Sequence, residues 1–238
     1  MGIRIHNIGG YLLNNYLLET PAGWIAIDTG YPHGEATFLR RFQKLAPLHS
    51  LQYIFLTHAH SDHTGFLARL LEKTNANVIL HPASNRALLA GVNDQPPGAG
   101  YPSPMAARMS ACIKDLSFPP VRVGNRAVFV AHDGEQPFQA MGLPIRLLCL
   151  PGHTAGSIGL FLEETGALFC GDAAMHTVIN PARHAIWIED AAEFSRSWDK
   201  MLAMRPSKIY PSHGTPFPPR DLEKYRHFLK GRELIPPR

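Results

Sequence analysis

A short apolar strand that runs into a cluster of histidines constrains this chain more than any other feature of its sequence. Residues 53–56 (Tyr-Ile-Phe-Leu) are continuously apolar, as expected of a strand buried on both faces of a sheet. The hexapeptide His58-Ala59-His60-Ser61-Asp62-His63 follows almost at once. Because side chains alternate along an extended chain, His58 and His60 can point to the same side and share one metal ion. The sequence therefore predicts a buried sheet with a metal site at its edge.

Glycine and proline residues separate further β-rich and helical segments along the chain. The expected strands are residues 3–8, 11–19, 24–27, 53–56, 78–80, 127–130, 145–150, 158–162, 167–170 and 208–210. The expected helices are residues 35–45, 62–73, 83–90, 191–204 and 221–229, with a further one near 105–113. Ser61 or Asp62 is expected to cap the second of these helices. Two successive β-rich halves that each end in helices predict two sheets packed face to face, with helices outside.

Length and composition favour one domain over residues 1–238, because 238 residues with 45% apolar side chains can bury one substantial core. A stretch rich in proline and glycine, residues 91–120, is expected to form an irregular excursion over the surface, and such excursions often act as lids or substrate loops. Tyr101 is a candidate lid residue there.

Charge and targeting features narrow the function classes. The 23 Lys and Arg against 19 Asp and Glu give a net charge of +4 without long like-charged runs, so nucleic acid is allowed as a partner but not indicated. No apolar leader segment and no run long enough to span a membrane is seen, so a cytoplasmic protein without a membrane partner is expected. Cys112, Cys149 and Cys170 are expected to be buried small apolar residues, not disulfide partners. Oligomeric state has no sequence signal.

Three later segments repeat the same design, in which a strand ends at a polar residue beside a glycine. They are Leu150-Pro151-Gly152-His153, Phe169-Cys170-Gly171-Asp172 and Tyr210-Pro211-Ser212-His213-Gly214. Each places one candidate ligand at the end of a strand, and the neighbouring glycine lets backbone approach the site closely.

These segments together resemble the metallo-β-lactamase superfamily, over about residues 7–213. The resemblance implies an α/β fold, the αββα four-layer sandwich with two mixed sheets packed face to face. It implies one metal ion held by His58, His60 and His153, and a second held by Asp62, His63 and His213. Asp172 would bridge the two ions, and Asp28 would hold the loop that carries His58 and His60 by hydrogen bonds.

The chemistry expected from this resemblance is hydrolysis of an ester, thioester or lactone bond in a small-molecule substrate. Two divalent ions, with zinc expected and iron or manganese as alternatives, would lower the pKa of a shared water to about 7 and so supply a bridging hydroxide. Asp62, together with that water, is the expected catalytic group, because its carboxylate can return a proton to the leaving group.

Other activities share the same motifs. Glyoxalase II enzymes of the superfamily add a C-terminal helical region, and this chain ends 25 residues after His213. Quorum-quenching lactonases carry a tyrosine three residues after the bridging aspartate, where this chain has Met175. Persulfide dioxygenases use a single iron, and phosphodiesterases or nucleases use the same ligands on phosphodiesters. A secreted β-lactamase is disfavoured by the aspartate at position 172, and a closed, purely structural metal site is the non-enzymatic alternative.

The remaining histidines are expected to be ordinary surface or core residues. They are His6, His33, His49, His81, His132, His184 and His227. His176, four residues beyond Asp172, is expected to be an exposed loop residue that could reach substrate.

Overall fold

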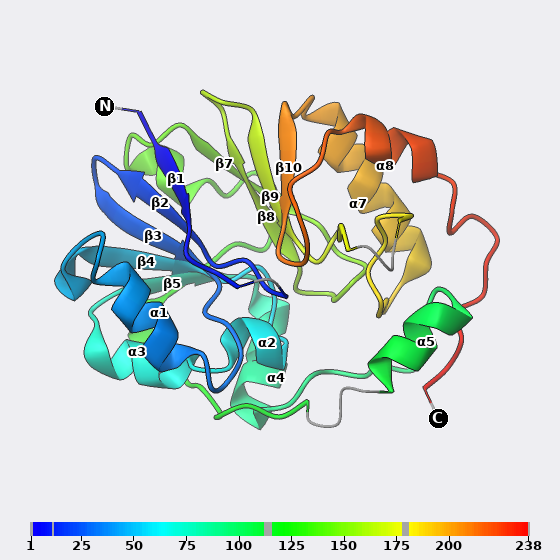
Figure 1. The fold of residues 1–238 in the computed structure, drawn as a ribbon, viewed down its shortest axis with the longest axis horizontal. Helices are drawn as coiled ribbons and strands as arrows, with labels where there is room; N and C mark the ends of the chain where they lie inside the picture. The colour runs from blue at the N-terminus through cyan, green and yellow to red at the C-terminus, as the bar shows by residue number, and fades with distance from the viewer. Residues whose placement is uncertain (1, 11, 112–115, 178–180, 238) are drawn as a thin grey trace.

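Two β-sheets lie side by side through the middle of the molecule, and helices cover their outer faces (Figure 1). The computed structural model describes residues 2–10, 12–111, 116–177 and 181–237. In Figure 1, α1 and α3 flank one sheet and α7 and α8 flank the other. The predicted four-layer αββα arrangement is confirmed.

The first sheet has six strands in the order β1-β2-β3-β4-β5-β6. Their bounds are β1 (Arg4–Asn7), β2 (Tyr16–Thr20), β3 (Gly23–Ile27), β4 (Leu51–Phe55), β5 (Asn77–Leu80) and β6 (Ala127–Phe129). The β1–β2 and β2–β3 pairs are antiparallel, whereas the pairs from β3 to β6 are parallel. The sheet is therefore mixed, with the carboxyl ends of β3 and β4 at one edge.

The second sheet has four strands in the order β10-β9-β8-β7. Their bounds are β7 (Ile145–Cys149), β8 (Ile158–Leu162), β9 (Ala167–Gly171) and β10 (Lys208–Pro211). Because β7 and β9 are each antiparallel to β8, and β10 is parallel to β9, the carboxyl ends of β7, β9 and β10 share one edge.

Helices fill the outer layers and the connections. They are α1 (Glu35–Phe42), α2 (Ser61–Thr64), α3 (Leu67–Lys73), α4 (Asn85–Ala90), α5 (Pro104–Ser110), α6 (Pro137–Ala140), α7 (Ala191–Ala203) and α8 (Arg220–Tyr225). Short 3₁₀ turns occupy η1 (Leu48–Ser50), η2 (Pro82–Ser84) and η3 (Gly124–Arg126). Within the described part of the chain, no helix is long and apolar enough to cross a bilayer.

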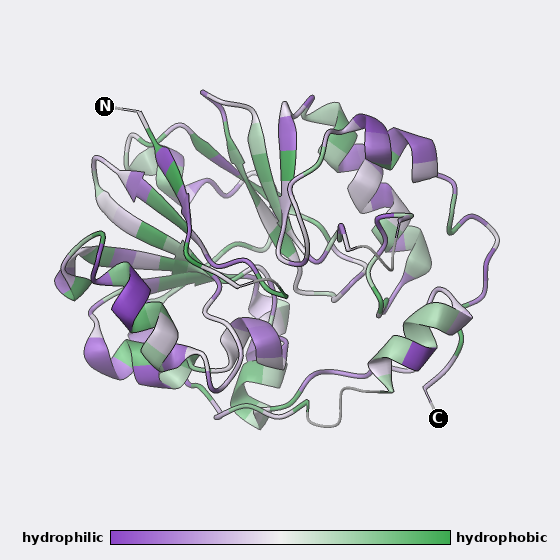
Figure 2. Ribbon diagram, in the orientation of Figure 1, coloured by the Kyte–Doolittle hydropathy of each residue, from purple (hydrophilic) through white to green (hydrophobic). Residues whose placement is uncertain are grey.

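Three separate apolar clusters account for the four layers, and Figure 2 shows the strands of both sheets dominated by hydrophobic residues. Strand β4 is typical of the layering, because Ile54 packs toward α1 and α3 while its neighbour Phe55 packs between the two sheets. Both side chains are fully buried. The continuously apolar run at residues 53–56 therefore reflects a strand covered on both faces, as predicted.

The predicted helix over residues 62–73 is wrong as a single element, because it breaks into α2 and α3. At the break, the Gly65 backbone N–H donates to the Gly30 carbonyl over 2.9 Å. A Cβ on Gly65 would lie 2.3 Å from the nitrogen of Pro32, so only glycine allows this approach. The predicted cap is also wrong: His60 occupies the cap position, and no side-chain bond caps the helix. The Ser61 N–H instead donates to Asn93 Oδ1 over 2.7 Å.

The proline-rich excursion passes from α4 to β6 and contains α5, in agreement with the helix expected near its centre. Its backbone pairs with two distant segments, Gly100 with Ile188 and Tyr101 with Ile235. The Tyr101 ring packs edge-on against Trp187, with centroids 5.4 Å apart. Cys170 is buried and Cys149 half-buried, both as free thiols, whereas Cys112 lies outside the described residues.

Candidate metal centre

The candidate ligands lie where strands of both sheets end. His58 and His60 follow β4 in the first sheet, and Asp62 and His63 lie in α2 directly after them. From the second sheet, His153 follows β7, Asp172 follows β9 and His213 follows β10. Residues that are up to 155 positions apart in sequence are thus brought to a common centre. The ligand atoms lie within 4.8 Å of one another in each of three overlapping groups, two of which are described below and the third of which, His58, His63 and Asp172, joins them.

The first group consists of His58, His60 and His153, all buried. His153 Nε2 lies 3.1 Å from His58 Nε2 and 3.1 Å from His60 Nδ1. Burial lowers the pKa of all three rings, and the neighbouring histidines lower it further for His58 and His60, reaching about 3 for His60. The rings are therefore neutral near pH 7, which is the state in which imidazole binds a metal.

The spacing of these nitrogens fits a bound cation. Two ligands at a zinc–nitrogen distance of about 2.05 Å in tetrahedral geometry are separated by about 3.3 Å, close to the observed separations. Without a cation between them, the lone pairs of the three converging imidazoles would repel one another. The donor set of the first group is thus suited to a divalent metal.

The second group combines Asp62, His63 and His213. His213 Nε2 lies 3.1 Å from Asp62 Oδ2, and His63 Nε2 lies 3.8 Å from the same oxygen. Burial acts to lower the pKa of both histidines, but nearby carboxylates outweigh it and raise the pKa of His213 to about 9. Burial acts to raise the pKa of Asp62, but His63 and His213 outweigh it and hold that pKa well below its usual range. This group is therefore charged, unlike the first.

Asp172 lies between the two groups. Its carboxylate oxygens are 3.7 Å from His153 Nε2, 3.7 Å from His63 Nε2 and 3.5 Å from His213 Nε2. Both Asp172 Oδ1 and His63 Nε2 are buried and have no hydrogen-bond partner. A cation between them would satisfy both atoms, since unpaired buried polar atoms are costly. The residues present therefore fit two metal ions with Asp172 in the bridging place.

A second set of hydrogen bonds fixes which nitrogen faces the centre in four of the five rings; the exception is His60, whose buried Nε2 has no hydrogen-bond partner among the described residues. Nδ1 of His63, His153 and His213 lies 2.8 Å from Asp28 Oδ2, Trp187 O and Leu12 O, respectively. These oxygens only accept, so each Nδ1 carries a proton and each Nε2 faces the centre; the Nε2 atoms of the charged His63 and His213 would give up their protons when a metal binds. His58 Nδ1 lies 3.1 Å from Thr57 Oγ1, whose own hydroxyl proton is donated to Asp28.

Asp28 has two tasks, of which the sequence indicated one. Its Oδ1 accepts the Thr57 N–H over 2.7 Å and its Oδ2 accepts the Thr57 hydroxyl over 2.7 Å, so it holds the residue that precedes His58. Its direct contact with the His63 ring was not foreseen from the sequence. Asp28 also adopts a φ of +58°, a conformation that aspartate tolerates better than most residues.

Four contributors to the centre were not predicted from the sequence: Thr57, Trp187, Leu12 and Tyr31. Trp187 and Leu12 act through backbone carbonyls, which leave no signature in residue type. Tyr31 interacts electrostatically with the centre: partial burial raises the pKa of its phenol to about 12, and the negative charges of Asp62 and Asp172 contribute to the shift. Its position just after Asp28-Thr29-Gly30 is the one signal that could have drawn attention to it.

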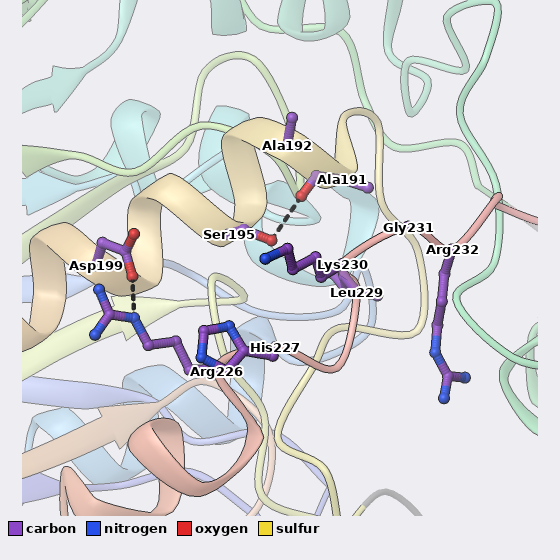
Figure 3. Close-up of a pocket in the computed structure, with 10 residues that line it drawn as sticks. All are labelled: Ala191, Ala192, Ser195, Asp199, Arg226, His227, Leu229, Lys230, Gly231 and Arg232. Carbon is purple, nitrogen blue, oxygen red and sulfur yellow. Dashed lines mark hydrogen bonds and ion pairs between the residues drawn. The ribbon is translucent and has the colours of Figure 1, made fainter.

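The other histidines have separate environments. His6 pairs with Glu19 over 3.0 Å, and His184 stacks on Phe228. His176 is half-buried, and not the exposed loop residue expected: its Nδ1 lies 3.0 Å from the Thr215 carbonyl. A surface pocket of about 480 Å³ between α7 and the segment after α8 contains His227 and several cationic side chains (Figure 3). None of the seven candidate ligands lines it.

Comparison with known proteins agrees with this geometry. Residues 8–213 match the family described as metallo-beta-lactamase superfamily. "Probable metallo-hydrolase YflN" from Bacillus subtilis is 25% identical over 229 residues, covering 89% of this chain and 84% of that protein. "Lactamase-like protein adaB" from Aspergillus niger is 29% identical over 205 residues, covering 85% of this chain and 50% of that protein, so the chain spans about half of its length.

Among solved structures, an archaeal metallo-beta-lactamase superfamily protein, ST1585 from Sulfolobus tokodaii, superimposes with a TM-score of 0.67. The match covers 98% of this chain and 88% of that chain at 19% sequence identity. At this identity the likeness concerns the fold alone.

Proposed function

Since the chain belongs to the metallo-β-lactamase superfamily, we propose that it is a metal-dependent hydrolase that cleaves an ester, thioester or lactone bond in a small molecule at the centre described above. The observation that carries the proposal is the convergence of seven ligand-type side chains from both sheets, with unpartnered buried atoms on His63 and Asp172. Relatives described as a metallo-hydrolase and as lactamase-like proteins support the general reaction class.

His58, His60 and His153 would hold one ion, Asp62, His63 and His213 the other, and Asp172 would bridge them. When bound, two divalent ions, with zinc expected, supply Lewis acidity and lower the pKa of water to about 7. The chain's own contribution is to keep the first group neutral, to keep Asp62 and Asp172 ionised, and to exclude solvent from one side of the centre.

Substrate would approach from the side of the second group. The Asp62 side chain is 21% exposed and that of His213 is 13% exposed, whereas the first group is almost completely covered. In this proposal the ionised Asp62 carboxylate would accept a proton from the attacking water and pass it to the leaving group. Tyr31, with 43% of its surface exposed and its phenol pKa raised in part by the charge of Asp62, would be suited to contact the bound substrate.

The test combines metal analysis with a substrate panel. Purified protein should contain about two divalent ions per chain, and should hydrolyse at least one class among esters, thioesters and lactones. The variant His58→Ala should lose metal and activity, whereas His227→Ala, which changes an exposed histidine in the outer pocket, should keep both. One iron per chain with sulfite formed from a persulfide would replace hydrolysis by oxygenation, and turnover confined to phosphodiesters would contradict the bond type proposed.

A further inference from the structure

The loop between β1 and β2 of the first sheet, of which residues 8–10 and 12–15 are described, holds the turn that carries His213 in the second sheet. Asn14 makes most of the contacts. Its backbone N–H donates to the Ser212 carbonyl over 2.8 Å. Its side-chain Nδ2 donates to the carbonyls of Pro211 and Gly214, over 3.0 Å and 2.7 Å. Three residues around His213 are thus bonded to one asparagine about 200 positions away in sequence.

The side chain of Asn14 has little freedom to do anything else. It is buried, with 9% of its surface exposed, and its Oδ1 accepts the Asn7 side-chain N–H over 2.8 Å. With two carbonyls facing one end of the amide and a donor facing the other, the orientation of the amide is determined by its partners. Both of its N–H donors are therefore committed to the His213 turn.

The same loop also binds the ligand ring itself, because Leu12 O accepts the proton of His213 Nδ1. The base of the loop is fixed by Arg41 of α1, whose Nη1 donates to the carbonyls of Ile8 and Gly9, each over 2.6 Å. The loop therefore sets both the position of the turn and the rotation of the imidazole.

On its other side the turn has no room to move. Gly214 has a φ of +87°, and a Cβ placed there would lie 1.7 Å from the His176 carbonyl oxygen. The His176 N–H donates to the His213 carbonyl over 2.9 Å. The turn is thus held between His176 and Asn14, and removing one of them would leave it supported from one side.

The first group of histidines is supported elsewhere. His153 bonds to Trp187 O and His58 bonds to Thr57. Among the described residues, the hydrogen bonds of the β1–β2 loop reach the ligand set only at His213 and its flanking residues. Loss of these bonds should therefore affect one ion site and spare the other.

We propose that Asn14 is a positioning residue for His213 that sets the affinity of the chain for its second metal ion. The inference rests on the proposed two-ion function and identifies what makes the second site depend on the N-terminal loop. Removing a group that orients a metal ligand typically weakens metal binding about 10- to 100-fold.

The test is a zinc titration of the metal-free full-length protein and of Asn14→Ala, with the two binding steps resolved. The second step should weaken about 10- to 100-fold while the first stays within about threefold. Gln136→Ala is the matched control, because the Gln136 amide also holds backbone by two hydrogen bonds, to Leu147 N and O in β7, six positions before His153. A merely structural role would lower the melting temperature in both variants without separating the two steps.

Asn14→Asp provides a second variant should Asn14→Ala fail to fold, since it keeps the volume and one acceptor but removes both donors. An unchanged second step in either folded variant overturns the positioning role, and so does equal weakening of both steps. A wild-type protein that binds only one ion overturns the two-ion function together with this inference. Two ions in the wild type and an unaffected variant overturn the inference alone.

Discussion

The two groups of candidate ligands differ in charge and in exposure, although only a few ångströms separate them. His58, His60 and His153 are neutral and enclosed, whereas Asp62, His63 and His213 combine charges of both signs and are open to solvent at two members. Structural metal sites are usually closed and catalytic sites keep an open position. We therefore propose that the first group anchors one ion and that the more exposed second group faces the substrate.

Removal of Asp172 should disrupt both groups of ligands at once, and it is expected to have the largest effect. Among the described residues, Asp172 is the one whose carboxylate lies within 4 Å of histidines from both groups. We expect Asp172→Ala to lower kcat/KM at least about 10³-fold, about 4 kcal/mol in the activation barrier, and to reduce bound metal. Asp199→Ala, which removes an exposed carboxylate paired with Arg226, is the control and should retain activity. Activity within tenfold of the wild type would exclude a bridging role.

Graded chelation should remove the two ions at different rates and so distinguish the two groups. The ion of the exposed group should leave first, followed more slowly by that of the enclosed group. Metal-free protein should melt about 10 °C lower, because an ion bound at a thousandfold excess over its Kd stabilises the fold by about 4 kcal/mol. Metal content and melting temperature measured along a chelator series provide the data. Loss of both ions in a single step would argue against two unequal sites.

Asp28→Asn should weaken metal binding by the second group more than by the first. An amide in place of the Oδ2 carboxylate oxygen turns a donor toward His63 Nδ1 and favours the wrong ring tautomer. Binding at the second site should weaken about 10- to 100-fold, with a smaller effect on the first site through Thr57. Asp94→Asn, at an aspartate paired with Arg86, should leave both sites unchanged. Equal weakening of the two sites would show that Asp28 acts through the loop and not through His63.

The smallest effect, a change in thermal stability, is expected at Glu189, which bonds to the segment around His153. Its backbone N–H donates to Gly152 O and its carboxylate accepts the Ala155 N–H, on either side of His153. Burial, followed by nearby Asp94, raises the pKa of Glu189 to about 7, against partial opposition from the Ala155 bond.

A raised carboxyl pKa favours the protonated form in the folded state. The stability that Glu189 contributes through its raised pKa is fully present below the unfolded pKa of about 4.5. It is lost as the pH rises through the folded pKa of about 7, where the buried carboxyl ionises. Glu189→Gln should therefore raise the melting temperature by about 2 to 4 °C at pH 8 and change it little at pH 4.5, after discounting for solvent screening. Thermal melts at both pH values check this, and destabilisation at pH 8 would contradict it.

Most of the fold was predictable because it follows local patterns. The run at residues 53–56 specified a doubly buried strand, and the glycine-flanked ends at His153, Asp172 and His213 located the carboxyl edges of three more strands. The break between α2 and α3 was not predictable. It depends on contact between Gly65 and Gly30, and helical periodicity of the apolar residues carries no information about that contact.

The sequence predicted that the seven candidate ligands lie together, but it did not predict the groups that support them. His58 and His60 are paired by strand alternation, which is a local rule. The contact of Asp28 with His63 and that of Leu12 with His213 join residues 35 and 201 positions apart. The contact with His213 is made by the backbone carbonyl of Leu12, so the residue type at position 12 does not predict it.

The origin of the ligands in both sheets has a consequence for how the protein folds. Each group takes members from the loop after β4 and members from the second sheet, so neither group is complete until the two sheets have docked. With the proposed ligand set, metal capture would be a late event in folding, and its rate would report the docking of the sheets and not the formation of either one. An ion added at the start of refolding would leave the early steps unchanged and slow only the reverse reaction, in which the sheets separate.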